Sequence, residues 1–141
     1  MQVKSIFMIE DEALLCDLFS EYVEALPDLK FIGYEKDGAT GIRQALELKP
    51  DIIVLDIRLP EVNGIEVLTM LRRKLPETRI IIFTGTLKEE TLRLANRHGA
   101  HAFVEKSQGL EELKRAIEAV QRGERYYSPG VAQIMRHFET E

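Results

Sequence analysis

The sequence predicts an α/β fold: a doubly wound, five-stranded parallel sheet between two layers of helices. Strand-like apolar runs alternate five times with helical patterns along the 141 residues, which is the order that builds such a sheet. The runs at residues 51–56 and 79–84 have continuous, β-branched centres, as expected for strands buried on both faces. Hydrophobic residues make up 45% of the chain, which is enough for a core beneath both helix layers.

The first two strands are expected at residues 3–9 and 29–35. From about residue 12, apolar residues at spacings of three and four indicate a helix, which Pro27 ends. Asp37 is placed to cap a second helix. The predicted apolar faces of these helices are Leu15, Leu18, Phe19, Tyr22 and Leu26, then Ile42, Ala45 and Leu46.

The remaining strands are expected at residues 51–56, 79–84 and 101–105. The loop after the third strand contains the helix breaker Pro60. The fourth helix begins after Thr86, because residues 86–89 match a capping box, and the fifth spans residues 110–122. The predicted apolar faces of the third and fifth helices are Ile65, Leu68, Leu71 and Leu75, then Leu113, Ala116, Ile117 and Val120.

Composition excludes several classes of protein. The net charge of −5 makes the chain as given a poor nucleic-acid binder. Cys16 is the only cysteine, so an internal disulfide is excluded. The N-terminus lacks the pattern of a signal peptide, and no apolar run is long enough to cross a bilayer. We therefore expect a cytoplasmic protein that does not engage membranes.

Polar side chains follow the predicted strands at the edge where ligands bind in such sheets. Glu10 and Asp11 follow the first strand, Asp56 ends the third, Thr84 ends the fourth and Lys106 follows the fifth. Clustered carboxylates need a cation, and a hard ion with oxygen ligands such as Mg²⁺ suits them. The sequence therefore predicts a magnesium site here.

The same set of residues suits phosphoryl chemistry. Asp56 is the best candidate nucleophile, because a carboxylate can attack phosphorus to form an acyl phosphate. Lys106 and the Thr84 hydroxyl can stabilise the phosphoryl oxygens. Taken singly, each residue has a structural alternative: Asp11 as a helix cap, Asp56 as a turn residue and Lys106 as a solvated lysine.

The stretches IFMIEDE, DIIVLDIRLPEVNGIEVL, IIFTG and AFVEK resemble the receiver domains of two-component response regulators, from about residue 3 to residue 123. We therefore expect a receiver domain at residues 1–123. The resemblance implies a CheY-like, three-layer α/β/α fold with strand order 2-1-3-4-5. It implies Asp56 as phosphoacceptor, and it implies Mg²⁺ bound by Asp11, Asp56 and the backbone carbonyl of Arg58, supported by Glu10. Glu10 stands where the family usually has Asp, and its longer side chain is expected to alter the metal affinity while keeping the charge.

The resemblance also implies a switch and its partners. Thr84 would move toward the phosphoryl group and draw Phe103 inward, changing the face formed by the fourth helix, fifth strand and fifth helix. Arg58 and Thr86 occupy variable positions that tune phosphoryl hydrolysis. The donor would be a sensor histidine kinase, and phosphorylation could produce a homodimer.

The tail, residues 124–141, follows the fifth helix. A short helix is expected after Pro129-Gly130, with Val131, Ile134, Met135 and Phe138 on one face. The run LEELKRAIEAVQRGERYYSPGVA resembles the end of receivers in the NarL/FixJ (LuxR-type) group, where a linker leads to a helix-turn-helix domain. DNA would then be bound only through an output domain absent from this chain. A standalone receiver, or a helix packed back on the domain, is the alternative.

Three rival functions share parts of this pattern. A haloacid-dehalogenase-type phosphatase needs a second Asp two residues after the nucleophile, where Arg58 stands. A flavodoxin-like cofactor binder needs a phosphate-binding loop after the first strand, which the sequence lacks. A phosphorylation-independent interaction module is the third alternative, and the full set of site residues counts against it. The receiver is therefore expected to be a signalling domain and not an enzyme acting on other substrates.

Overall fold

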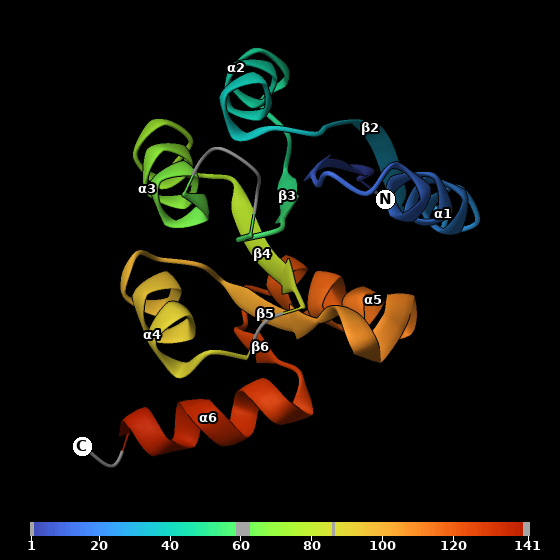
Figure 1. Ribbon diagram of the computed structural model, residues 1–141. Coiled ribbons are helices and arrows are strands. Elements are labelled where there is room, and N and C mark those ends of the chain that lie inside the picture. Colours follow the sequence, from blue (N-terminus) through green and yellow to red (C-terminus); the bar gives the residue numbers. More distant parts are fainter. Residues whose placement is uncertain (1, 59–62, 86, 140–141) are drawn as a thin grey trace.

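The computed structural model of the chain describes residues 2–58, 63–85 and 87–139. These residues form one sheet of six parallel strands, in the order β2-β1-β3-β4-β5-β6 (Figure 1). The predicted doubly wound parallel sheet and the order of its five strands are confirmed, and a sixth strand that we did not predict extends it. The strands are β1 (Lys4–Ile9), β2 (Leu29–Glu35), β3 (Ile52–Leu55), β4 (Arg79–Thr84), β5 (Ala102–Glu105) and β6 (Tyr126–Tyr127).

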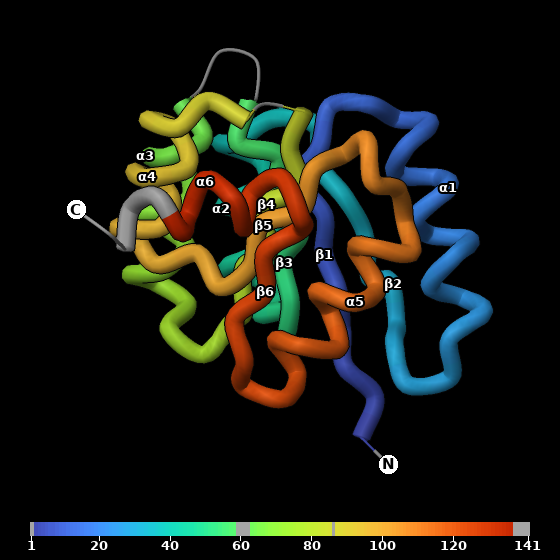
Figure 2. Tube along the Cα trace, turned by 90° about the horizontal axis from the view of Figure 1, so that it is seen from below, coloured from blue at the N-terminus to red at the C-terminus, as the bar shows by residue number. Residues whose placement is uncertain are grey.

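Helices cover both faces of this sheet. Helices α1 and α5 lie on one face, α2, α3 and α4 lie on the other, and α6 lies beside α4 (Figures 1 and 2). None of the described helices is both long and apolar enough to cross a membrane. The helices are α1 (Ala13–Glu24), α2 (Gly38–Leu48), α3 (Gly64–Lys74), α4 (Glu89–Arg97), the 3-10 helix η1 (Lys106–Gln108), α5 (Gly109–Gln121) and α6 (Pro129–Glu139).

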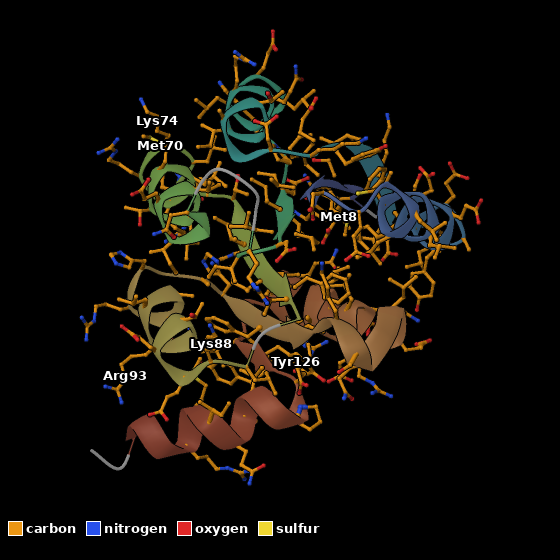
Figure 3. All side chains as sticks on the ribbon, in the orientation of Figure 1. Met8, Met70, Lys74, Lys88, Arg93 and Tyr126 are labelled. Carbon is orange, nitrogen blue, oxygen red and sulfur yellow. The ribbon has the colours of Figure 1, made fainter. Side chains whose placement is uncertain are left out.

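The alternation of side chains along each strand divides the core into two clusters. In β1, Phe7 and Ile9 belong to the cluster beneath α2, α3 and α4. Met8, labelled in Figure 3, belongs to the cluster beneath α1 and α5, with Cys16 and Phe19 of α1. Both faces of the central strands are therefore buried, which explains their uninterrupted apolar runs.

The buried face of α1 is rotated relative to the prediction. Its buried residues are Cys16, Phe19 and Val23, whereas Leu18 is 47% exposed. The predicted face included Leu18 because two apolar stripes, offset by one residue, both fit helical spacing. The stripe that contains Cys16 and Val23 faces the sheet, so the prediction for Leu18 was wrong.

The start of α2 follows the prediction, but the start of α4 does not. The Asp37 side chain accepts a hydrogen bond from the Thr40 backbone N–H at 2.9 Å, which caps α2. Helix α4 begins at Glu89 with Lys88 in the N-cap position, so a capping box over residues 86–89 was wrong. Thr86 itself and Pro60 lie outside the described residues.

The tail folds back on the domain. β6 pairs with β5, and the Ser128 N–H donates to the carbonyl oxygen of Phe103 at 2.9 Å. The expected tail helix forms as α6, and Val131 and Met135 of its predicted apolar face are buried. The side chain of Phe138 lies outside the described residues. The tail thus lies against the edge of the sheet next to β5 and against α4.

Candidate functional site

The carboxyl ends of the central strands meet at one edge of the sheet and bring the predicted polar residues together. Glu10 directly follows β1, Asp56 directly follows β3, and Lys106 directly follows β5. The strand order reverses between β1 and β3, so the loops after these strands lead to opposite faces of the sheet. Such a point leaves a crevice where ligands bind in open α/β sheets.

Lys106 is held at the centre of this edge by carboxylates. Its Nζ lies 2.9 Å from Oδ2 of Asp56 and 2.7 Å from Oε1 of Glu10. Burial by itself would lower the pKa of Lys106, but the hydrogen bonds and charges of Glu10 and Asp56 outweigh it and raise the pKa above its ordinary value. Lys106 therefore carries its positive charge at neutral pH.

The Asp56 carboxylate is oriented by two donors, one on each oxygen. Its Oδ1 accepts a hydrogen bond from the Arg58 backbone N–H at 2.9 Å, and its Oδ2 faces Lys106. Asp56 is 4% exposed, and its own N–H donates to the Ile9 carbonyl oxygen at 3.0 Å. A carboxylate this buried needs charge compensation, which Lys106 provides.

Glu10 is the most deeply buried acid of the group, at 1% exposed. Its Oε2 accepts a hydrogen bond from the Glu12 backbone N–H at 2.9 Å, and its Oε1 is paired with Lys106. Burial raises the pKa of Glu10 to about 7, although Lys106 and the Glu12 N–H act to lower it and Asp56 acts to raise it. The contact with Lys106 therefore lowers the pKa of Glu10 by less than burial raises it.

Three of the predicted metal ligands lie close enough to share one ion. Glu10, Asp11 and Asp56 each offer a carboxylate oxygen, and these oxygens lie within 4.8 Å of one another. The N-cap position of α1 is Glu12 and has no side-chain capping bond, so the alternative role of Asp11 as a helix cap was wrong. Clustered carboxylate oxygens fit a hard divalent cation such as Mg²⁺. The proposed fourth ligand, the Arg58 carbonyl, stays a prediction.

A shallow pocket opens over these residues. Its volume is about 290 Å³, and a Cβ placed on Gly85 at its rim would meet no atom within 4 Å. The pocket therefore has room for a small anion above the Asp56 carboxylate. Its lining residues are Asp11, Glu12, Asp56, Arg58, Gly85 and Lys106.

The two residues expected to act as a switch are both fully buried. Thr84, the last residue of β4, is paired in register with Glu105, directly before Lys106. Phe103 is covered by Tyr127 of β6, whose ring stacks on it with centroids 5.7 Å apart and an interplanar angle of 24°. The structure thus brings Thr84 to the same edge as Asp56, and it places the tail directly over Phe103.

No contact of Glu12 with Lys106 was predicted from the sequence. The Glu12 Oε1 lies 3.2 Å from Lys106 Nζ, so a third carboxylate contacts this lysine. The Glu12 side chain is 63% exposed, and an exposed pair of this kind contributes little to stability. The acidic run at residues 10–12 was the available signal.

The arrangement combines the predicted nucleophile Asp56, the ammonium group of Lys106 and an excess of negative charge. With all groups ionised, four carboxylates (Glu10, Asp11, Glu12 and Asp56) oppose the single ammonium of Lys106. Such a site favours a divalent cation, which would complete the charge balance. A carboxylate beside cations is an arrangement that can carry out phosphoryl transfer.

The chain is similar in sequence to proteins of a known family. Residues 6–118 match the family model of the response regulator receiver domain. The nitrate/nitrite response regulator NarL of Escherichia coli K12 is 30% identical over 131 residues, covering 93% of this chain and 61% of NarL. The protein-glutamate methylesterase/protein-glutamine glutaminase of Thermotoga maritima is 36% identical over 115 residues, covering 79% of this chain and 33% of that protein.

Solved structures of response regulators are also similar to this chain. A two-component response regulator of the LuxR family from Aurantimonas sp. SI85-9A1 has a TM-score of 0.91 and 30% identity, covering 99% of this chain and all (100%) of that chain. The predicted resemblance to NarL-like, LuxR-type receivers is confirmed by these relatives. The chain spans 33% and 61% of the length of the two curated relatives described above.

Proposed function

Because the chain belongs to the response regulator receiver domain family of two-component systems, we propose that it is a phosphorylation-controlled switch in which Asp56 accepts a phosphoryl group from a sensor histidine kinase. The contact between Lys106 Nζ and Asp56 Oδ2, at 2.9 Å, is the observation that carries the proposal. It joins a nucleophile and a fixed positive charge that lie 50 residues apart in the sequence. In this role the chain is a signalling domain, acting only on its own phosphoryl group.

The reaction uses the two separately held oxygens of Asp56. One carboxylate oxygen attacks phosphorus, and the bond between phosphorus and the donor breaks with its electron pair leaving on the donor. The Arg58 N–H keeps the carboxylate plane oriented during the attack, and Lys106 remains beside the new phosphoryl oxygens. The Thr84 hydroxyl then provides a further hydrogen bond to the phosphoryl group.

A magnesium ion bound by Glu10, Asp11 and Asp56, with the Arg58 carbonyl, would supply the positive charge that this edge lacks. The pKa of Glu10, which burial and then Asp56 raise to about 7, is compatible with this assignment, because a cation bound beside the carboxylate would favour its charged form. The longer side chain of Glu10, in place of the usual Asp, retains the charge and keeps its contact with Lys106.

The proposal is tested by incubating the chain with acetyl phosphate and Mg²⁺ and measuring intact mass. Wild type should gain one phosphoryl group, and Asp56→Asn should gain none. Asp51→Asn is the matched control, because Asp51 is exposed and lies at the opposite end of the same strand. Labelling of Asp56→Asn at the wild-type level would refute the assignment, and an unlabelled wild type would favour the phosphorylation-independent module.

The metal site has its own test. Mg²⁺ should raise the melting temperature of wild type in a concentration-dependent manner, because a ligand that binds only the folded state stabilises it. Asp11→Asn should weaken this dependence, since it removes one of the three clustered carboxylates. The same Mg²⁺ response in Asp11→Asn and wild type would exclude Asp11 as a ligand.

The output of the switch belongs to the same proposal. We place it on the face formed by α4, β5 and α5, and we expect Arg58 and Thr86 to tune the lifetime of the phosphoryl group. Thr86 lies outside the described residues. This chain covers 61% of the response regulator NarL. We include in the proposal that a further domain binds DNA under the control of the receiver. A homodimer that forms on phosphorylation is also part of the proposal. A cytoplasmic location fits a kinase-controlled receiver.

A further inference from the structure

The tail segment, residues 126–139, covers the proposed switch residue. Tyr127 stacks on Phe103, and α6 contacts both α4 and β5. Val131 and Met135 of α6 are buried in the same apolar cluster as Phe103. Phe103 therefore has no exposed surface, although β5 lies next to the edge of the sheet.

The tail segment also contacts the residues that flank the phosphoacceptor edge. The backbone N–H of Glu105, which pairs with Thr84, donates to the Ser128 hydroxyl at 3.1 Å. A Cβ on Gly130 would overlap the Glu105 carboxylate and would lie 3.4 Å from Cδ1 of Leu87. The start of α6 thus rests on the end of β5 and on the loop that follows β4.

A second set of contacts anchors the segment at β6. Tyr126, labelled in Figure 3, donates a hydrogen bond from its hydroxyl to Glu112 of α5 at 2.5 Å. Arg125, the residue directly before the tail segment, donates to the Tyr127 hydroxyl at 2.8 Å and also to the side chain of Asn96 in α4, while α6 of the segment contacts α4 directly. The tail segment therefore touches α4, β5 and α5, the three elements of the proposed output face.

We propose that the tail segment is a latch that packs on this face while Asp56 is unmodified and loosens when Asp56 is phosphorylated. The proposal rests on the proposed function. Phe103 is already buried beneath Tyr127, so a shift of its ring toward Thr84 cannot bury it further. Such a shift instead withdraws the ring from Tyr127, and packed interiors do not tolerate the gap that this leaves. The two arrangements therefore exclude one another, and phosphorylation shifts the population between them.

Hydrogen exchange of the whole chain tests the latch, with beryllofluoride and Mg²⁺ as the phosphoryl mimic. The reporters are the amides of Ser128 and Ala132, which donate to the carbonyl oxygens of Phe103 and Ser128. Their exchange should accelerate by about fivefold or more on binding, the lower end of usual coupling between sites. The same addition to Asp56→Asn should leave both rates unchanged.

The reverse direction gives an independent test, because coupling between two sites is reciprocal. Met135→Ala removes a buried side chain of the latch and should lower the beryllofluoride concentration at half-saturation by about fivefold. Gln133→Ala, at an exposed position of the same helix, should leave it unchanged. If Met135→Ala unfolds the domain, as judged by circular dichroism, Val131→Ala makes a smaller deletion in the same contact.

The outcomes separate the latch from the function on which it rests. If beryllofluoride protects the amides after β1 and β3 while Ser128 and Ala132 exchange at their original rates or more slowly, the latch is overturned and the phosphoacceptor site stands. If beryllofluoride does not bind wild type at all, both proposals fall. Equal half-saturation in Met135→Ala and wild type would also overturn the latch.

Discussion

His101 joins the start of β5 to β4 through a hydrogen bond that only the neutral imidazole can accept. The Ile80 N–H donates to Nδ1 of His101 at 3.0 Å. Burial, together with the positive charges of Arg72, Arg79 and Arg125, lowers the pKa of His101 from 6.5 to about 4. Between these two values, the unfolded chain carries a proton on His101 that the folded chain does not.

The sign and size of the resulting pH dependence follow from this difference. The folded pKa of His101 lies below the unfolded one, so its contribution to stability is complete above pH 6.5 and is lost as the pH falls toward 4. At ~1.4 kcal/mol per pKa unit, moving from pH 7 to pH 5 should remove about 2 kcal/mol of unfolding free energy.

The titration of Glu10 changes the unfolding free energy in the opposite direction over the same pH range. Its folded pKa of about 7 lies above the ordinary value of 4.5, so its contribution is complete below pH 4.5 and is lost as the pH rises toward 7. Acidification from pH 7 to pH 5 should therefore restore about 2 kcal/mol through Glu10. The two groups nearly cancel in the wild-type chain.

The contributions of His101 and Glu10 can be separated by urea unfolding at pH 7 and pH 5. Unfolding is followed by circular dichroism in a buffer containing a chelator. Relative to wild type, acidification should stabilise His101→Asn by about 2 kcal/mol and destabilise Glu10→Gln by a similar amount. With a urea dependence of ~1–3 kcal/mol per M, the midpoints should move in opposite directions by about 1 M. Wild-type behaviour in His101→Asn would show that the neutral, hydrogen-bonded histidine is not the source of the dependence.

Three further substitutions have calculable effects on stability, all measurable by urea unfolding. Asp37→Ala removes the cap of α2 and should cost about 1 kcal/mol, whereas Asp37→Asn should retain most of the stability; equal losses in both would contradict the capping role. Thr78→Val leaves the Pro50 carbonyl oxygen without its buried 2.7 Å hydrogen bond and should cost ~1–3 kcal/mol, so an unchanged midpoint would contradict this account. Gly64→Ala should cost about 3 kcal/mol or more, because its Cβ would overlap the Ile57 carbonyl oxygen, which as backbone has little freedom to move; a fully stable variant would show that the start of α3 can shift.

The sheet was predictable because its signals are local. The bounds of β2 and β4 agree residue for residue with the apolar runs, since their ends carry charged residues or turn formers. The strand-end position of Asp56 and Lys106 followed from the same runs, so their meeting at one edge could be expected from topology. Their pairing at 2.9 Å is therefore the expected consequence of a parallel sheet.

The parts that were not predictable depend on contacts between distant segments. β6 consists of two tyrosines, and so short a run has no pattern that distinguishes a strand from a linker. Its pairing with β5, in which Tyr127 lies opposite Phe103, makes it a strand. In α1, the stripe that contains Leu18 and the stripe that contains Val23 both fit helical spacing. The packing of neighbouring elements determines which of the two stripes is buried. The sequence shows Glu12 in the acidic run after β1. Its contact with Lys106, however, depends on the conformation of the loop after β1.

The short strand β6 also determines how the sheet meets other molecules. By occupying the outer side of β5, it takes up backbone hydrogen-bonding groups of an apolar strand that would otherwise template intermolecular pairing. β6 itself offers only two residues, and Pro129 follows soon after, which limits any further strand addition. The tail therefore protects the monomer against edge-to-edge aggregation, and any state in which the tail lifts must be short-lived or quickly covered by another surface.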